Sequence, residues 1–294
     1  MMKFSIILPT FNRDNMVKVS IKSVISQSFK DWELIVVDDG STDNTKEIVE
    51  EFVKLDKRIK YIFQENKERS AARNNGIKKA KGDWICFLDS DDIYHTNHLE
   101  EFKRLIEKTN KKEALYISGV SYGEYSEDLE EYNMSHNNNL EFVLLNTIGT
   151  PRACVSKQIL IKYKFNEVIK IGEDKELWSR ISQFYPVIFH KKKTFIELEH
   201  RGRSINNIKN KLEHLKTTKF ILNKLTTSKK IKRKVLSDSY FSVSKYYLNN
   251  NSKINALRFI LLSLSIDISN TQSTHKIYIC LSLLFLTVPK EYNR

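Results

Sequence analysis

Short apolar runs alternate with amphipathic stretches through the first hundred residues of the chain. Short apolar runs bounded by polar or turn residues are typical of buried strands. Between the runs, apolar residues recur at helical spacing, as they do from Val17 to Ile25. This alternation predicts an α/β fold in which helices cover both faces of a mostly parallel sheet. The expected strands are residues 4–8, 33–37, 59–63 and 84–88, and the expected helices between them are residues 17–25, 44–53 and 68–79.

The alternation is looser after Asp92. Residues 123–139 are polar and rich in Asn and Glu, so we expect a loop there. From residue 204 onward the pattern predicts only helices. Between these points we expect helices at 97–108 and 173–184, and strands at 115–120, 187–190 and 194–198.

The positive charge of the chain is concentrated in its last third. The net charge is +13, yet residues 1–200 carry 31 Lys and Arg against 32 Asp and Glu, whereas residues 201–294 carry 18 against 4. Such a region faces nucleic acid, an anionic membrane or an acidic partner, or it is the solvated face of a helix. Three widely spaced cysteines without metal-ligand spacing favour a reduced cytosolic compartment. The first residues are expected to form a strand and not a signal peptide.

Three polar clusters follow three of the predicted strands. They are residues 9–13, 38–43 and 89–92. Because the carboxyl ends of parallel strands meet at one edge of a sheet, we expect the clusters to form one binding crevice. The second cluster by itself would also suit a turn and a helix N-cap.

The third cluster concentrates negative charge at a strand end. Asp89, Asp91 and Asp92 lie within four positions, which costs energy unless a cation or hydrogen-bond donors neutralise them. Carboxylates suit Mg²⁺ or Mn²⁺ that bridges phosphate oxygens, and a solvated acidic turn is the alternative.

Arg69 and Arg73 are four residues apart, so on a helix they share a face. They are candidates to clamp a diphosphate or the rim of a nucleobase, and a surface salt-bridge pair is the alternative.

Taken together, these clusters make the chain similar to glycosyltransferase family 2, whose members have the nucleotide-diphospho-sugar transferase fold called GT-A. The resemblance covers about residues 1–205, and its five motifs occur in the order of the family. The matching segments are Ser5–Arg13, Val36–Thr45, Ala72–Gly76, Phe87–Asp92 and Gly172–Arg180.

The resemblance implies a set of site residues. Pro9 and Thr10 would line the base, and Asp39 would hydrogen-bond the uracil edge. Asp89 would hold the ribose or the sugar, and Asp91 would coordinate the metal ion. Together with the residues argued from spacing, the complete set of candidates to bind the nucleotide-sugar is Pro9, Thr10, Asn12, Asp39, Arg69, Arg73, Asp89 and Ser90.

The resemblance also names Asp174 as the general base. An inverting transfer needs one carboxylate to take the proton of the acceptor hydroxyl, while the leaving diphosphate needs a metal ion and cations. The base must therefore lie apart from the metal cluster, and a helix N-terminus there would favour an ionised carboxylate. Glu173 would support the base or simply cap the helix. The Gly-Gly-Phe often found ahead of the base is replaced here by residues 163–167, which bears on the acceptor side.

Three histidines stand near the predicted site. Family members often carry a histidine after the last strand, and His200 stands there; it would approach the metal ion or the diphosphate, or be a structural histidine. His95 and His98 are three residues apart without a partnering cysteine. We interpret them as surface or acceptor-rim residues and not as zinc ligands.

The basic region holds two apolar stretches, residues 256–262 and 277–288. The second is too short to span a bilayer. It could lie in the membrane interface while lysines contact anionic headgroups. Alternatively, the region forms a helical hairpin packed on the first domain or on a second subunit.

The sequence thus favours an inverting glycosyltransferase that moves a sugar from a UDP-sugar to a hydroxyl of a glycan or lipid-linked glycan, with Mn²⁺ or Mg²⁺, in surface polysaccharide synthesis. It would be cytoplasmic, peripheral on the inner face of the membrane. The expected domains are 1–204, with a nucleotide-binding half (1–92) and an acceptor-side half (93–204), and a helical region at 205–294.

Two other functions fit the sequence less well. An adaptor with an inert α/β domain would use the basic region, but carboxylates at the strand ends would repel nucleic acid, and no aromatic platform for bases is visible. We therefore expect no nucleic-acid partner. A nucleotidyltransferase would need a glycine-rich phosphate loop after the first strand, where Pro9–Asn12 stands.

Overall fold

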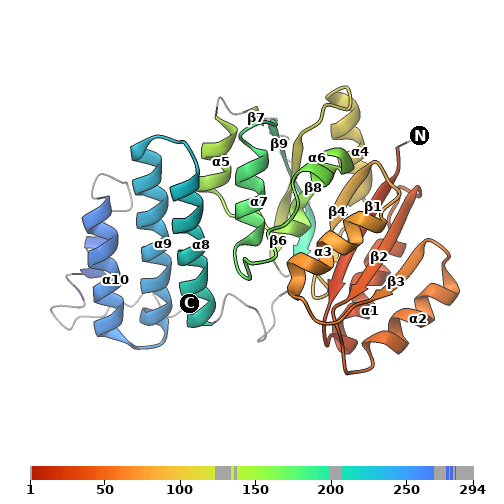
Figure 1. The fold of residues 1–294 in the computed structure, drawn as a ribbon, viewed down its shortest axis with the longest axis horizontal. Helices are drawn as coiled ribbons and strands as arrows, with labels where there is room; N and C mark the ends of the chain where they lie inside the picture. Colours follow the sequence, from red (N-terminus) through yellow and green to blue (C-terminus); the bar gives the residue numbers. More distant parts are fainter. Residues whose placement is uncertain are drawn as a thin grey trace. The chain divides into compact units, whose positions relative to one another are not determined.

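The computed structural model describes residues 2–122, 134–135, 138–198, 207–267, 276–277, 279–280 and 282. The chain divides into two compact units, Met1–Glu199 and His200–Arg294. Each unit is described by itself below. Figure 1 shows the elements of both.

The first unit begins with the predicted parallel sheet. Its strands lie in the order β3-β2-β1-β4, and each neighbouring pair is parallel. Parallel neighbours need a crossover connection between them, and here a helix follows each of the first three strands. The elements are β1 (Phe4–Thr10), α1 (Asp14–Ile25), β2 (Trp32–Asp38), α2 (Thr45–Leu55), β3 (Ile59–Phe63), α3 (Glu68–Lys79) and β4 (Trp84–Phe87).

Beyond β4 the sheet becomes mixed. Strand β8 (Ala153–Ser156) lies between β4 and β6 (Leu115–Tyr122) and is antiparallel to both. Strand β9 (Val187–Glu197) runs parallel to β6. The short strands β5 (Ile93–Tyr94) and β7 (Met134–Ser135) pair with β9 in antiparallel fashion.

Two details of this half differ from the sequence-based expectation. The two strands expected at 187–190 and 194–198 are one strand, β9, because the chain continues through the intervening lysines. Its register against β6 shifts around Gly119, as at a β-bulge. In the range expected to be a loop, 123–139, β7 is a strand, Asn138 caps the next helix and Asn139 begins it; residues 123–133, 136 and 137 lie outside the described residues.

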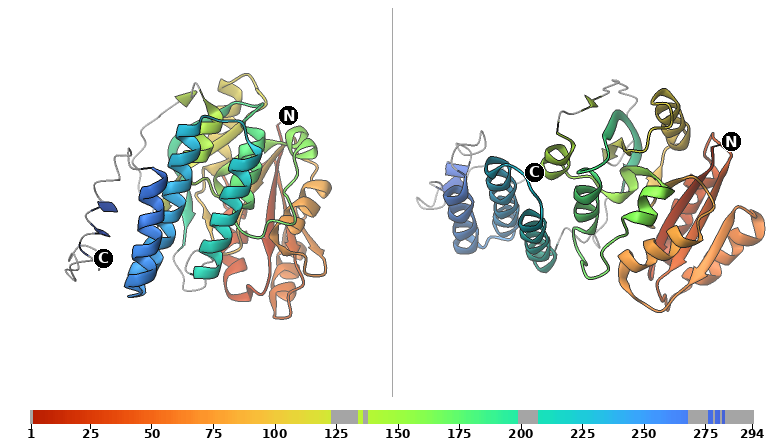
Figure 2. Two further views of the ribbon diagram at one scale, coloured as in Figure 1. Left: turned by 60° about the vertical axis from the view of Figure 1, so that its left-hand side comes forward. Right: turned by 45° about the horizontal axis from the view of Figure 1, so that its top comes forward.

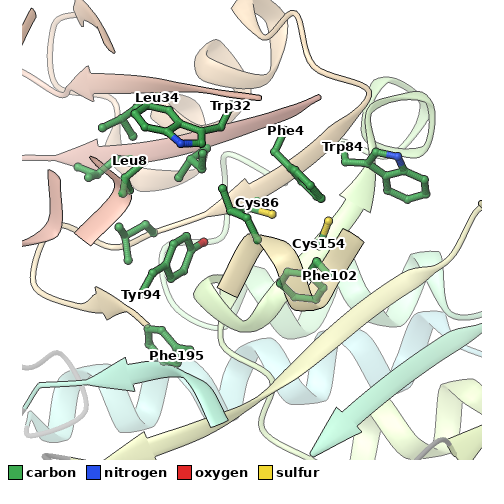
Figure 3. Close-up of a cluster of buried hydrophobic side chains, with 14 of the residues drawn as sticks. Phe4, Leu8, Trp32, Leu34, Trp84, Cys86, Tyr94, Phe102, Cys154 and Phe195 are labelled. Atoms are coloured by element: carbon green, nitrogen blue, oxygen red, sulfur yellow. The ribbon is translucent and has the colours of Figure 1, made fainter. Parts of the chain in front are cut away.

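Helices cover both faces of the sheet, as predicted. Alternate residues of β1 point to opposite faces, so Ile6 and Leu8 belong to one buried cluster and Ile7 to the other. Figure 3 shows the first cluster, in which Tyr94 and Cys86 lie near the middle. The first cluster includes residues of α1, α2 and α4 (His98–Lys108). The second includes residues of α3, α5 (Asn139–Leu145), α6 (Lys157–Lys162) and α7 (Glu173–Ile181).

Gly76 lets α3 lie directly on β1. A Cβ at this position would be 2.5 Å from Cγ2 of Ile7, which no side chain can tolerate without a shift. The helix is therefore held against the centre of the sheet. This contact fixes where the residues of its first turns, including Arg73, lie relative to the strand ends.

The second unit is helical in its described part, as predicted. It contains α8 (Ile208–Lys224), α9 (Lys229–Asn249) and α10 (Lys253–Ile266). Both views in Figure 2 show the three helices side by side, with α9 in contact with the other two. Ser237 of α9 donates to the carbonyl oxygen of Ser263 of α10 at 2.9 Å, which joins these two helices. Within the described residues, no helix combines the length and the apolar character that crossing a bilayer requires.

Candidate active site

The three polar clusters lie at one edge of the sheet. Thr10 at the end of β1 is the register partner of Asp38 at the end of β2. On the other side, Ile7 pairs with Phe87 of β4, and the next residue, Leu88, donates its N–H to the Ile7 carbonyl oxygen at 3.0 Å. Asp89 follows immediately. The expectation that these clusters share one edge is therefore met by the strand register (Figure 1).

The neighbouring carboxylates Asp38 and Asp39 have different surroundings. The two oxygens of Asp38 accept hydrogen bonds from the Ser41 N–H at 2.8 Å and from the Tyr61 hydroxyl at 2.7 Å. Burial and the Asp38 charge raise the pKa of Tyr61 above its ordinary value, so this hydroxyl remains a donor. Asp38 is thus occupied by the protein itself. Of the pair, Asp39 is the residue that keeps an oxygen without a recorded partner in the described part of the chain.

Asn12 ties the loop after β1 to the loop after β2. Its φ of 50° is left-handed, a conformation that asparagine tolerates better than most residues. Its N–H donates to Ser41 Oγ at 2.9 Å, and its Oδ1 accepts from the Thr42 N–H at 2.8 Å. Pro9 and Thr10 are buried behind this loop. The Thr10 hydroxyl oxygen is buried and has no hydrogen-bond partner among the described residues.

The third cluster divides its carboxylates between structure and site. Asp92 is buried and accepts from the N–H of Leu198 at 3.1 Å, so it fixes the chain just after β9. Asp89 and Asp91 remain partly exposed. Asp91 Oδ2 lies 3.6 Å from Arg13 Nη2, and Ser90 between the two acids is buried.

Arg73 connects Asp89 at the strand edge to α7, the helix that carries the candidate base. It is 1% exposed. Its Nη2 donates to Asp89 at 2.8 Å and its Nη1 to Glu173 at 2.7 Å. Burial alone would lower the pKa of Arg73, but Asp89 and Glu173 raise it above its ordinary value, so the side chain stays charged. Arg69, one turn earlier, is only half-buried and has no ion pair recorded within the described residues.

The ion pairs of Arg73 with Asp89 and Glu173 could not be seen from the sequence. The shared face of Arg69 and Arg73 suggested a pair that clamps phosphate, whereas Arg73 already holds two carboxylates. Contact of either arginine with a diphosphate stays a prediction.

Glu173 and Asp174 begin α7, and they are not equivalent. Gly172, with φ of 80°, caps the helix in a left-handed conformation that favours glycine. Glu173 is buried against Arg73, while Asp174 is half-buried and accepts from the Lys175 N–H at 2.6 Å. Burial, together with the Glu173 charge, raises the pKa of Asp174 to about 7 against the opposing effects of the Lys175 N–H and Arg73. A carboxyl group that titrates near neutral pH suits a general base.

The loop before α7 is fastened to α3 and to the end of β4. Asn74 forms two hydrogen bonds with the backbone of Phe165, both at 3.0 Å. The Phe165 ring packs edge-on against Phe87 and against Trp178 of α7. Sequence reasoning missed Asn74 and Phe165 as positioning residues, although Asn74 stood in a matched segment.

The histidines have mixed outcomes. His200 lies outside the described residues, so its predicted approach to the metal ion stays a prediction. His98 is fully buried, stacks on Tyr94 and pairs with Thr194 Oγ1 at 2.8 Å. Its interpretation as a surface or acceptor-rim residue is wrong, because the apolar spacing of α4 directs it into the core. His95 is half-buried, with Nδ1 2.6 Å from Asn97 Oδ1.

The acids at this edge have the chemistry for a hard cation. In the described part of the chain, no three His, Cys, Asp or Glu side chains converge to hold an ion. Mg²⁺ and Mn²⁺, however, are commonly held by one or two carboxylates together with substrate phosphates and water. Asp91, partly exposed at the strand edge beside Asp89, fits that donor set.

Relatives of the chain are named as glycosyltransferases. A "GalNAc(5)-diNAcBac-PP-undecaprenol beta-1,3-glucosyltransferase" of Campylobacter jejuni is 30% identical over 283 residues, which is 92% of this chain and 90% of that protein. An uncharacterized glycosyltransferase of Rickettsia bellii is 37% identical over 186 residues. That match takes in 61% of this chain but spans only 26% of the Rickettsia protein.

Solved structures show the same fold. TarS 1–349 of S. aureus in complex with UDP has a TM-score of 0.64 and 19% identity, covering 97% of this chain and 89% of that one. The mannosyltransferase PcManGT of Pyrobaculum calidifontis, in complex with GDP-Man and Mn²⁺, has a TM-score of 0.66 and 14% identity, covering 99% and 81%. The first unit therefore has the GT-A fold expected from the sequence. Residues 5–167 match the family described as Glycosyl transferase family 2, and the chain belongs to that family.

Proposed function

We propose that the chain is an inverting glycosyltransferase that moves a sugar from a UDP-sugar to a hydroxyl of a glycan or lipid-linked glycan. The observation that carries the proposal is the linkage Asp89–Arg73–Glu173, which joins the strand edge to the start of α7 beside Asp174. Support comes from a relative named for acting on an undecaprenol-linked glycan and from a structural neighbour seen with UDP-GlcNAc.

The donor is held at the edge formed by β1, β2 and β4. Asp39 accepts from the base, with Pro9 and Thr10 behind it, and Asn12 keeps the two loops together. Asp89 and Ser90 face the ribose and the sugar, and Arg69 adds positive charge near the diphosphate. Mn²⁺ or Mg²⁺ bound by Asp91, with His200 as a further ligand, would neutralise charge on the leaving diphosphate.

Asp174 acts on the acceptor. Its carboxylate takes the proton of the acceptor hydroxyl as that oxygen bonds to the anomeric carbon. The bond between the anomeric carbon and the diphosphate oxygen breaks at the same time, and UDP leaves with the electron pair. Attack from the side opposite the diphosphate inverts the anomeric centre. Glu173, fixed by Arg73, keeps the first turn of α7 in place.

The first prediction concerns Asp91. Mn²⁺ should strengthen UDP binding to the wild-type chain, and Asp91→Ala should remove that gain because the ion loses its protein carboxylate. Calorimetric titration with UDP, with and without Mn²⁺, measures the difference. Asp31→Ala, a partly exposed acid just before β2, is the matched control. An undiminished gain in Asp91→Ala would contradict the assignment.

An anionic membrane surface is the proposed partner of the second unit. Lys229 and Lys230 are exposed in the first turn of α9, and that turn contains no acidic residue. Positive charge is disfavoured at a helix N-terminus, so these lysines do not serve the helix itself. Arg233 Nε donates to the Ile266 carbonyl oxygen at 2.6 Å, which places the start of α9 beside the end of α10.

Exposed apolar side chains lie in the second half of α10. Leu261 and Leu262, about one turn before Ile266, are 51% and 37% exposed. Exposed cations and exposed leucines on the same helix pair suit a surface of acidic headgroups over acyl chains. We therefore place the enzyme in the cytoplasm, peripheral on the inner face of the membrane, in the synthesis of a surface polysaccharide. No nucleic-acid partner is proposed.

The second prediction tests that surface. Each lysine near an anionic membrane contributes about 1 kcal/mol, so Lys229→Glu with Lys230→Glu should lower binding to phosphatidylglycerol vesicles by roughly 30-fold or more at low salt. Vesicle flotation measures the bound fraction. Lys54→Glu with Lys57→Glu, at two exposed lysines of the first unit, makes the same change in net charge and serves as the control. Equal binding of the double variant and the wild type, or no binding of the wild type at low salt, would contradict the proposal.

A further inference from the structure

A chain of side-chain hydrogen bonds ends on Asp39. Gln64, just after β3, donates from Nε2 to Asp39 Oδ1 at 2.7 Å. Asn75 of α3 donates from Nδ2 to Gln64 Oε1 at 2.8 Å. The direction of the chain is fixed, since an ionised carboxylate only accepts and Gln64 must present its NH₂ group to it. The remaining Gln64 oxygen then needs a donor, which Asn75 supplies.

The hydrogen bonds from Asn75 through Gln64 leave the two oxygens of Asp39 unequal. Oδ1 also accepts from the Lys67 N–H at 2.9 Å, so two donors occupy its two lone pairs. No donor to Oδ2 is recorded among the described residues. Because Oδ2 is not among the fully buried side-chain atoms that lack a partner, it is open to a ligand. Asp39 therefore offers one oxygen, and not two, to a ligand.

The number of accepting oxygens distinguishes the nucleobases. Uracil presents one N–H between two carbonyl oxygens, so one carboxylate oxygen satisfies its edge. Guanine presents two adjacent N–H donors, and a carboxylate recognises it best with both oxygens free. Cytosine presents an unprotonated ring nitrogen at the corresponding position, which repels a carboxylate. An Asp39 with one available oxygen matches uracil.

We propose that Gln64 and Asn75 are specificity-determining positioning residues that favour uracil over guanine by occupying Oδ1 of Asp39. This inference rests on the proposed function, in which Asp39 receives the base. The fold itself does not decide between bases, because similar structures contain UDP in one case and GDP-Man in another.

The test measures the affinities of UDP, GDP and CDP by calorimetry in the presence of Mn²⁺. The wild type should bind UDP most tightly. In Gln64→Leu, one lone pair of Oδ1 is released, so guanine gains a hydrogen bond to a charged group. The preference for UDP over GDP should then narrow by roughly tenfold. Asn75→Ala only loosens Gln64 and should narrow the preference by roughly twofold to threefold.

The controls separate failure of the inference from failure of the proposed function. Gln183→Leu removes an exposed glutamine after α7 and should leave the preference unchanged. Asp39→Ala should weaken UDP binding. If it does so while Gln64→Leu and Asn75→Ala keep the wild-type preference, or if the wild type prefers GDP, this inference is overturned. If Asp39→Ala binds UDP as the wild type does, or the wild type binds no nucleotide, the proposed donor site is wrong as well.

Discussion

Asp174→Asn is expected to lower the rate of sugar transfer by roughly 10²–10⁴-fold while leaving affinity for the donor almost unchanged. The proposed work of Asp174 is done in the transition state, on the acceptor hydroxyl, so its removal depresses turnover and not donor binding. Asparagine keeps the size of the side chain and can still accept from the Lys175 N–H. Initial rates of transfer and calorimetric affinity for the UDP-sugar are the two measurements.

The same residue predicts a pH dependence. A general base must be deprotonated, so kcat/KM should rise with pH and level off above the pKa of about 7 that burial and Glu173 give Asp174. Glu173→Gln removes the neighbouring charge and should shift this rise to lower pH. Transfer by Asp174→Asn at nearly the wild-type rate would exclude Asp174 as the base. A larger loss in Glu173→Gln than in Asp174→Asn would assign the role to Glu173.

Arg73→Leu is expected to cost about 3–5 kcal/mol in the free energy of unfolding. Leucine fills much of the buried space, but it leaves Glu173, which is 4% exposed, without its ion partner. Urea unfolding followed by circular dichroism measures the loss. Arg69→Leu, a half-buried arginine on the same helix with no recorded ion pair, should lose less than about 1 kcal/mol.

A second variant distinguishes lost charge pairing from lost packing. Adding Glu173→Gln to Arg73→Leu removes the uncompensated carboxylate and should recover part of the stability. If Arg73→Leu unfolds at the same urea concentration as Arg69→Leu, the buried ion pairs do not hold α7 against α3.

The first half of the fold could be predicted because its signals are local. The apolar runs of β1, β2 and β4 are each followed by a polar cluster, and parallel pairing brings those clusters to one edge. Strand β8 carried no such signal. It consists of only four residues. The short helices α5 and α6, before and after it, are each marked in the sequence only by an N-cap residue, Asn138 and Ser156. Its antiparallel insertion between β4 and β6 depends on tertiary packing.

The partners of the charged residues could not be predicted from spacing. Arg73 and Glu173 are 100 positions apart, so no local pattern links them. The matched segments predicted that each would belong to the site, but not that one would hold the other. In the same way, the difference between Asp38 and Asp39 depends on Tyr61, Gln64 and the Lys67 N–H, which the fold brings from β3 and the loop that follows it.

The central claim is that this chain transfers sugar from a UDP-sugar with the help of a divalent ion. The most direct measurement is release of UDP from a panel of UDP-sugars by the wild-type chain, in Mn²⁺ and in EDTA, with GDP-mannose as the comparison donor. We expect that at least one UDP-sugar is consumed in Mn²⁺, that EDTA abolishes the reaction, and that Asp174→Asn does not support it. Equal turnover in EDTA, or consumption of GDP-mannose alone, would contradict it.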